Sequence, residues 1–332
     1  MKVLVTGAGG FLGRAVVREV VARGHHVIAL VRPTTDVEAL AWPDHSVTVV
    51  RGDLRRPGPW RDELTGAEVI VHLAAATSGD FNEQWAGTVV ATEQLLDALD
   101  LDALARYVHV SSLAVYDIDS VVPRGRLDET VPLESRPERR DPYTATKLVQ
   151  EQLVREACAA AGTELVVTRP GAIYGPGKEW GHGAAARVGP VALIVAPNAK
   201  LRLVHVDNCA AAIGAAIDHP AAGGRSLNLV DDGLPTHLEY FRRCRRVGLT
   251  SGWAVPVPWV MLSALGHVLE LVNSVVLRGR ARLPELLSLP RLTARWKPLT
   301  YPNDAARTAL GWEPAVSIEA GIQTLVSQRD RS

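Results

Sequence analysis

The sequence predicts an α/β protein with a doubly wound parallel sheet and a smaller C-terminal α/β substrate domain. Three observations predict this architecture. A short apolar run near the N-terminus leads at once into a glycine-rich turn and then into a helical pattern. Further short β-branched runs, each followed by small or polar residues, are typical of buried parallel strands. A tyrosine and a lysine four residues apart begin another long helical pattern, so they share one helix face.

The first strand, turn and helix predict a dinucleotide site. Residues 3–5 are apolar, and residues 14–23 carry a helical apolar pattern. Between them, Gly7 allows a tight turn, Gly10 lets backbone approach a pyrophosphate, and Gly13 lets the helix pack closely on the strand. The helix N-terminus offers free N–H groups to phosphates. The spacing is GxxGxxG rather than the commoner GxGxxG, and an ordinary glycine turn is the alternative. The predicted cofactor-binding residues here are Gly7, Gly10, Phe11, Leu12 and Gly13.

The end of the second predicted strand, 26–31, favours NADP(H). An acidic residue here would hold the ribose 2′-hydroxyl of NAD, but the chain has Arg32 instead. A guanidinium presents a planar set of donors that suits a 2′-phosphate. Asp36 lies nearby and keeps NAD(H) open, and Arg32 stacking on adenine or lying in solvent is the alternative.

Two more predicted strands, 47–50 and 69–73, end in residues that suit a cofactor. Asp53 follows the first and would accept from the adenine amino group, or else cap a turn. Small residues follow the second and leave room for ribose and diphosphate. The predicted contacts are Asp53, Leu54, Leu73, Ala74 and Ala75.

The fifth predicted strand, 107–110, places hydroxyl groups where ligands bind in such sheets. Ligands lie beyond the C-terminal ends of parallel strands, so Ser112 should face the substrate, with Ser111 beside it. Further along, Asp141 is a good N-cap and Pro142 a good first residue for a helix that ends at Gly162.

The helix pair Tyr143 and Lys147 predicts acid/base chemistry. A free tyrosine titrates near 10, which is high for work at neutral pH. An ammonium about 4 Å away would stabilise the phenolate by up to ~4 kcal/mol and lower its pKa. A surface Tyr–Lys pair is the alternative, but the glycine turn and the serines favour a catalytic function.

With these motifs, the chain resembles an extended short-chain dehydrogenase/reductase, of the NAD-dependent epimerase/dehydratase superfamily with a Rossmann fold. The resemblance extends over nearly the whole chain. The matching segments are 5–13, 52–54, 71–75, Ser111–Ser112 before 115–116, 143–147, 169–177, 205–210, 226–229 and 310–314.

The resemblance implies a role for each motif residue. Tyr143 would be the general acid/base, Lys147 would tune it and hold the nicotinamide ribose, and Ser112 would bind the reacting oxygen. Pro170 and Ile173 would line the nicotinamide side. Family members often have Asn where this chain has Thr88; either Thr88 substitutes as a hydrogen bonder or a proton-relay water is lost, which puts the rate in question.

Two positions favour one branch of the family. Ala172 stands where nucleotide-sugar enzymes commonly have Asn, and Asn208 where they have Asp. Both resemble the 3β-hydroxysteroid dehydrogenase branch, which acts on apolar alcohols and ketones. The sequence therefore predicts hydride transfer between a ketone and a secondary alcohol on a steroid- or polyketide-like substrate. A nucleotide-sugar epimerase, dehydratase or reductase with tightly held NAD(P) is the second hypothesis, and a non-catalytic dinucleotide-sensing protein the third.

The motifs also suggest domain limits. We expect a dinucleotide-binding domain over 1–175, regaining about 201–231, and a substrate domain from 176–200 and 232–332. Segment 136–140 is expected to be a loop before the catalytic helix. By resemblance, helices at about 82–99 and 143–161 would form a homodimer.

A late apolar stretch, 253–277, is predicted to be an amphipathic helix that packs on the substrate domain or a partner. Pro256 and Pro258 interrupt its start, so a transmembrane helix is not favoured. Contact with a membrane surface is less favoured than packing. The expected apolar face is Leu262, Leu265, Leu269, Val272 and Val276, opposite Ser263, His267, Glu270 and Ser274.

Composition limits the remaining classes. The 332 residues are 47% apolar and 22% charged with a formal net charge of zero, so we expect a globular enzyme and no nucleic-acid partner. Cys158, Cys209 and Cys244 lack metal-binding spacing, and no metal site is predicted. The strand at the very start predicts no signal peptide and, with the few cysteines, a cytoplasmic protein.

Overall fold

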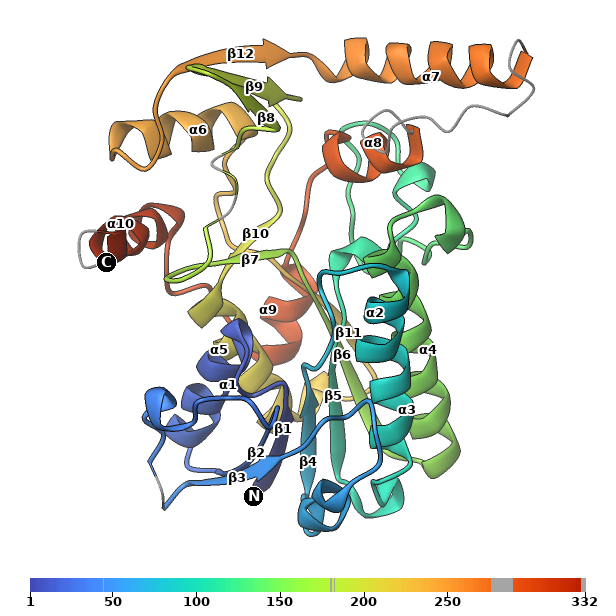
Figure 1. The fold of residues 1–332 in the computed structure, drawn as a ribbon, viewed down its shortest axis with the longest axis vertical. Helices are drawn as coiled ribbons and strands as arrows, with labels where there is room; N and C mark the ends of the chain where they lie inside the picture. The colour runs from blue at the N-terminus through green and yellow to red at the C-terminus, as the bar shows by residue number, and fades with distance from the viewer. Residues whose placement is uncertain (44, 180, 182, 276–288, 330–332) are drawn as a thin grey trace.

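Seven parallel strands form the central sheet, in the order β11-β6-β5-β4-β1-β2-β3 (Figure 1). The computed structural model describes residues 1–332 except 44, 180, 182, 276–288 and 330–332. The predicted doubly wound parallel sheet is confirmed, and the expected strands are present to within about two residues at each end. The strands are β1 (Lys2–Thr6), β2 (His26–Val31), β3 (Val47–Arg51), β4 (Val69–His72), β5 (Arg106–Val110), β6 (Glu164–Pro170) and β11 (Ser226–Leu229).

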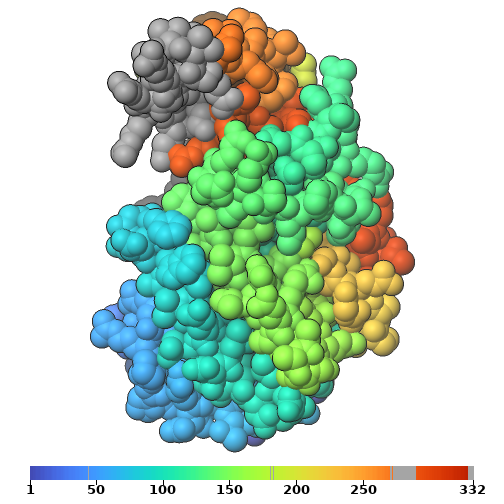
Figure 2. All heavy atoms as spheres, turned by 90° about the vertical axis from the view of Figure 1, so that its right-hand side faces the viewer, coloured from blue at the N-terminus to red at the C-terminus, as the bar shows by residue number. Residues whose placement is uncertain are grey.

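Helices cover both faces of this sheet because its strands are apolar on both sides. Val3 and Val5 pack into one apolar cluster and Leu4 into another, as alternation along a strand requires. The first cluster holds α1 (Phe11–Ala22), α5 (Val206–Asp218) and α9 (Asp304–Leu310), and the second holds α3 (Ala91–Leu96) and α4 (Pro142–Ala161). Figure 2 shows α4, in green, beside α3 and the short α2 (Phe81–Trp85), in cyan.

The remaining elements lie beyond the C-terminal ends of the strands. β7 (Ala172–Tyr174) pairs with β10 (Leu203–His205), so the predicted strand near 201–206 exists but does not join the large sheet. A second small sheet contains β8 (Ala186–Val188), β9 (Val191–Val195) and β12 (Trp253–Val257). The helices of this part are α6 (His237–Arg246), α7 (Trp259–Val275), α8 (Leu289–Trp296) and α10 (Ile318–Arg329).

The apolar stretch 253–277 differs from its prediction. Its first residues form the edge strand β12, which accommodates Pro256, and only α7 is helical. Leu262 packs against α8, but Leu265, expected on the packed face, is 47% exposed. Val276 lies outside the described residues. Other exposed apolar residues of α7 are Val260, Met261, Val268 and Leu271. Within the described ranges, no helix has both the length and the hydropathy needed to cross a bilayer.

Candidate active site

The turn between β1 and α1 has two positions that admit only glycine. Gly7 has φ +67°, and a Cβ on it would lie 3.1 Å from the backbone nitrogen of Ala74. A Cβ on Gly13 would lie 2.1 Å from the carbonyl oxygen of Gly7. The helix therefore packs on the turn at a distance that no side chain permits.

The same turn has the space and the donors that a diphosphate requires. Gly10 is the N-cap of α1, and a Cβ there would meet only the carbonyl oxygen of Gly7, at 3.1 Å. The N–H groups of the first helical turn have no acceptor within the helix, and no acidic side chain lies there. Phe11 and Leu12, in that turn, are half-buried. These residues fit a dinucleotide.

The charged residues at the ends of β2 and β3 differ in whether they form hydrogen bonds with other groups of the protein. Arg32 is exposed. Asp53 accepts from the backbone nitrogen of Arg55 at 3.0 Å and from its Nε at 2.9 Å, which lowers the pKa of Asp53 to about 2. Asp53 thus caps a turn, the alternative that the sequence left open. Arg51, which sequence reasoning missed, donates from Nη1 to the carbonyl oxygens of residues 33 and 35 at 3.0 and 2.9 Å.

The catalytic helix begins and ends where the sequence indicates. The Asp141 carboxylate accepts from the backbone nitrogen and the hydroxyl of Thr144, each at 3.0 Å. Gly162 closes the helix with φ +74°. Tyr143 therefore lies in the first turn of α4, with Lys147 one turn later.

Ser112 and Tyr143 come together from β5 and α4. Ser112 follows β5 and accepts from the backbone nitrogen of Ala114 at 3.1 Å. Its side chain also forms a hydrogen bond with Tyr143, which lowers the pKa of the phenol. Burial of Tyr143 and the nearby Asp141 raise that pKa, and burial is the largest effect, so the pKa lies above its ordinary value.

The expected lowering of the Tyr143 pKa by Lys147 is therefore not observed. The physical reason is the direction of the ammonium, which faces the sheet. Lys147 is 2% exposed, and Nζ donates to the carbonyl oxygen of Val110 at 2.7 Å and to Oε1 of Gln150. Burial lowers the pKa of Lys147 to about 7, although Glu151 opposes this shift.

Gln150 connects Lys147 to the predicted cofactor loop. Its Nε2 donates to the carbonyl oxygen of Ala74 at 3.0 Å and to the hydroxyl of Thr92 at 2.8 Å. Gln150 is fully buried, and sequence reasoning missed it. The available signal was a polar residue on the buried face of the helix, three positions after Lys147.

His72 and Thr6 extend this network into the glycine turn. The Thr6 hydroxyl accepts from the backbone nitrogens of Leu73 and Ala74, at 3.2 Å each, so its proton goes to Nδ1 of His72 at 2.8 Å. Nε2 of His72 lies 3.0 Å from the hydroxyl of Thr92 and 3.0 Å from Nε2 of Gln150. Burial lowers the pKa of His72 to about 3, which keeps the ring neutral.

A buried ion pair supports the end of β6, where Pro170 was predicted to line the nicotinamide. Arg169 donates to Glu151 from Nη2 at 2.5 Å and from Nε at 3.2 Å. Its Nη1 donates to the hydroxyl of Tyr116 at 2.9 Å, which donates to Asn228 at 2.7 Å. Arg169 directly precedes Pro170, so these contacts fix the backbone there.

Thr88, which stands where family members often have Asn, still forms a hydrogen bond. Thr88 is fully buried, and its hydroxyl accepts from the backbone nitrogen of Ala76 at 3.0 Å. Thr88 therefore holds the chain that follows β4.

The other predicted site residues lie along the C-terminal edge of the sheet. Leu54, Ser111 and Pro170 are buried, and Leu73, Ala74, Ala75 and Ile173 are half-buried. Parallel strands end on the same edge, which is why residues so far apart in the chain lie near one another.

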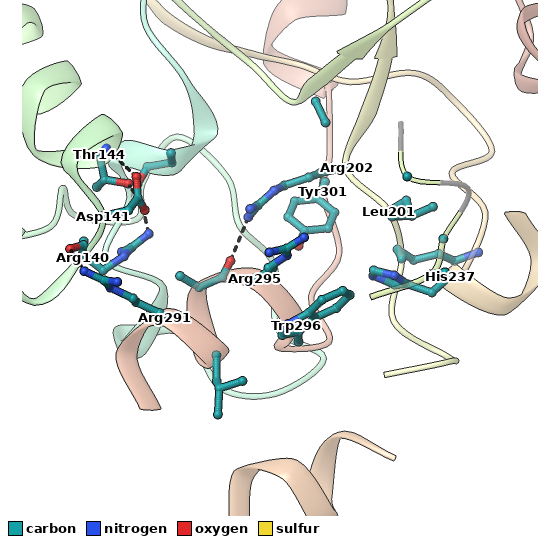
Figure 3. A pocket seen from close by; sticks show the side chains of 18 residues that line it. Arg140, Asp141, Thr144, Leu201, Arg202, His237, Arg291, Arg295, Trp296 and Tyr301 are labelled. Carbon is teal, nitrogen blue, oxygen red and sulfur yellow. Dashed lines mark hydrogen bonds between the residues drawn. The ribbon is translucent and has the colours of Figure 1, made fainter. Parts of the chain in front are cut away.

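A cavity of about 440 Å³ lies between the large sheet and α8, lined in part by neighbours in the chain of Ser112 and Tyr143 (Figure 3). Ala114, Thr144 and Ala172 line it from the side of the large sheet, and α8 closes the opposite side. Further lining residues are Arg140, Asp141, Lys200, Leu201, Arg202, His237, Arg291, Leu292, Arg295, Trp296 and Tyr301. Two lining residues, Ala114 and Thr144, closely follow Ser112 and Tyr143 in the sequence. The cavity combines apolar with basic side chains.

Known proteins are similar to this chain in sequence and in fold. Residues 3–229 match the NAD dependent epimerase/dehydratase family. The chain is 27% identical to a 2-alkyl-3-oxoalkanoate reductase of Stenotrophomonas maltophilia (strain K279a), over 98% of both chains. It is 31% identical to a 4-hydroxy-2-methyl-3-oxo-4-farnesyl-3,4-dihydroquinoline-1-oxide ketoreductase of Stigmatella aurantiaca, over 98% of this chain and 96% of that one.

Among solved structures, the fold is similar to UDP-glucuronic acid 4-epimerase from Bacillus cereus in complex with NAD. The TM-score is 0.74 at 19% identity, covering 100% of this chain and 99% of that chain. The family match, the reductase relatives and the fold agree: the chain belongs to the NAD dependent epimerase/dehydratase family and is an NAD(P)-dependent oxidoreductase of the extended short-chain dehydrogenase/reductase type.

Proposed function

We propose that this protein interconverts a ketone and a secondary alcohol on a largely apolar substrate, with NADP(H) as cofactor. Tyr143 gives or takes the proton at the reacting oxygen, Ser112 donates a hydrogen bond to that oxygen, and Lys147 holds the cofactor ribose. The observation that carries the proposal is the hydrogen bond between Ser112 and Tyr143, whose chain neighbours Ala114 and Thr144 line a cavity that also contains the apolar Leu292 and Trp296.

When bound, the nicotinamide supplies or accepts the hydride. The chain's own residues perform the rest of the reaction. Burial raises the pKa of Tyr143, so the phenol keeps its proton until a carbonyl oxygen begins to gain charge, and it is then a ready general acid. The relatives named as a ketoreductase and an oxoalkanoate reductase support reduction of a ketone.

The choice of NADP(H) rests on Arg32, which is exposed at the end of β2, with Arg51 held at the same loop. A charge-assisted contact with a 2′-phosphate contributes about 1.5–3 kcal/mol. Arg32→Ala should therefore weaken NADPH binding roughly tenfold or more while leaving NADH binding unchanged. Equal loss for both cofactors would contradict this preference.

Oxidation of NADPH with a panel of apolar ketones tests the activity. Tyr143→Phe should lower kcat/KM by about 10²–10⁴-fold, since general acid catalysis contributes that much. Tyr107→Phe is the matched control, because the Tyr107 hydroxyl is buried in β5 and has no hydrogen-bond partner among the described residues. Parental activity in Tyr143→Phe would refute the proposal.

A nucleotide-sugar epimerase, dehydratase or reductase is the second candidate function, and the basic residues of the cavity favour it. It predicts turnover of UDP- or dTDP-sugars with NAD(P) retained through purification. Turnover of these sugars, with no ketone consumed by any variant, would replace the first proposal.

We also propose a homodimer through the surface formed by α2, α3 and α4, which lie side by side in Figure 2. Phe81 and Trp85 on α2 are 48% and 37% exposed, and their rings lie 5.7 Å apart. Light scattering should give twice the mass of one chain. The double variant Phe81→Ser, Trp85→Ser should have the mass of a single chain.

A further inference from the structure

The substrate cavity contains an excess of basic side chains that ketone reduction does not require. Among the described residues, five cationic side chains line it, against the single carboxylate of Asp141, which already caps α4. The cationic residues are Arg140, Lys200, Arg202, Arg291 and Arg295. A cavity built only for an uncharged apolar substrate has no use for this charge, because such a substrate would remove water from the cationic groups, several of them exposed or half-buried, without giving them an anionic partner.

Two of these cations have acidic partners elsewhere. Nη1 of Arg140 lies 3.0 Å from a carboxylate oxygen of Glu134, and both side chains are buried. Nζ of Lys200 lies 4.0 Å from Glu239 at the surface. Arg291 donates to the backbone oxygen of Arg140 at 3.4 Å, which orients its guanidinium at the cavity wall.

Arg202 and Arg295 differ, since neither has a carboxylate partner in the described part of the chain. Nη1 of Arg202 donates to the carbonyl oxygen of Ala294 at 3.1 Å, and its guanidinium also bonds Tyr301. The Arg295 guanidinium lies 5.0 Å from the ring centroid of Trp296. Figure 3 shows both arginines on the same side of the cavity, next to Tyr301 and Trp296.

The fold thus keeps two positively charged guanidinium groups near each other, and the groups that contact them are uncharged. Burial and the charge of Arg202 both lower the pKa of Arg295. The nearby His237 adds no third positive charge at neutral pH, because burial and these two arginines lower its pKa to about 4. Guanidinium groups present paired donors that match the oxygens of carboxylate and phosphate groups.

We propose that Arg202 and Arg295 form an anion subsite for the substrate, which takes a carboxylate or phosphate group on an otherwise apolar molecule. This inference rests on the proposed ketone chemistry and adds the substrate class. The reacting carbon lies at the Tyr143 end, and the apolar body contacts Leu292 and Trp296. An uncharged sterol would leave the arginine pair without an anion.

Thermal unfolding with NADP⁺ present tests the subsite without turnover. Dodecanoate and dodecyl phosphate should raise the unfolding midpoint, and dodecan-1-ol should not, because only the acids present anionic oxygens. Arg295→Gln and Arg202→Gln should each weaken the acids' apparent affinity roughly tenfold or more. Arg242→Gln, an exposed change of the same charge outside the cavity, is the control and should bind like the parent.

Turnover of 3-oxododecanoate and its methyl ester separates the two proposals. The parent should prefer the acid, and Arg295→Gln should lose that preference, because its kcat/KM should fall much more for the acid than for the ester. Equal turnover of acid and ester by the parent would overturn the subsite but leave the ketone chemistry standing. No turnover of either, with arginine-dependent stabilisation by the acids, would overturn the ketone chemistry alone. Stabilisation by UDP but not by dodecanoate or dodecyl phosphate would overturn the apolar substrate.

Discussion

Replacing Gln150 with Met tests whether Lys147 depends on the network behind it. Met keeps the length of the side chain but removes the acceptor for Nζ, leaving only the carbonyl oxygen of Val110 among the two protein acceptors described above. A hydrogen bond to a charged group contributes about 1.5–3 kcal/mol. If that energy is fully expressed in the transition state, kcat/KM falls roughly 10- to 150-fold.

The pH profile gives a second readout. Lys147 must be protonated to hold the cofactor ribose, and burial lowers its pKa to about 7. We therefore expect kcat/KM of the parent to fall as pH rises above about 7. In Gln150→Met the ammonium loses an acceptor, so its pKa drops further and the falling limb moves to lower pH.

The assay is NADPH oxidation from pH 5 to 9, with kcat and KM separated and rates corrected for folded protein by urea unfolding. Gln152→Met is the control, since the exposed side chain of Gln152 on the same helix donates to Glu156 at 2.8 Å, far from Lys147 and the cofactor loop. Gln150→Glu keeps an acceptor for Lys147 and should hold the limb at or above its parental pH. A Gln150→Met enzyme with parental kcat/KM and an unshifted limb would refute the reasoning.

Two further predictions concern binding and stability. Gly13→Ala would place a Cβ 2.1 Å from the carbonyl oxygen of Gly7, so the turn must shift; NADPH affinity should fall at least tenfold in fluorescence titration, and unchanged affinity would mean that α1 can move freely. Burial raises the pKa of Asp231 from 3.8 to about 6, although Asn208 and His205 donate to it at 2.7 and 2.8 Å. The folded protein then binds more protons than the unfolded chain between about pH 4 and 6, so this group lowers stability as pH rises through that range. Asp231→Asn should remove that component, which urea midpoints at pH 4 and 7 would reveal; an identical pH difference in both proteins would contradict the shift.

The large sheet could be predicted because its signals are local. The strand His26–Val31 is apolar from Val27 onward and includes the β-branched Val27, Ile28 and Val31, and its ends match the predicted ends. The ends of α4 follow from Asp141, Pro142 and Gly162, each of which has a preferred place at a helix terminus. Such residues act on their immediate neighbours, so the local sequence is enough to predict where the helix begins and ends.

The features that were missed depend on contacts between distant segments. Lys147 bonds a carbonyl oxygen 37 positions away, and nothing near it in the sequence indicates that direction. β12 was placed in a helix because its apolar run continues into α7, and only pairing with β9 makes it a strand. The basic cavity was missed for the same reason, since Arg202 and Arg295 meet only after α8 packs against β10's segment.

The strand order has a consequence for synthesis. Strands β1 to β6 and the catalytic helix lie within the first 170 residues, but β11, which completes one edge of the sheet, ends at Leu229. The α8 wall of the cavity comes later still, at Leu289–Trp296. Domains fold from the N-terminus during synthesis. A nascent chain would therefore assemble Ser112, Tyr143 and Lys147 while still on the ribosome, before it has any wall to select a substrate.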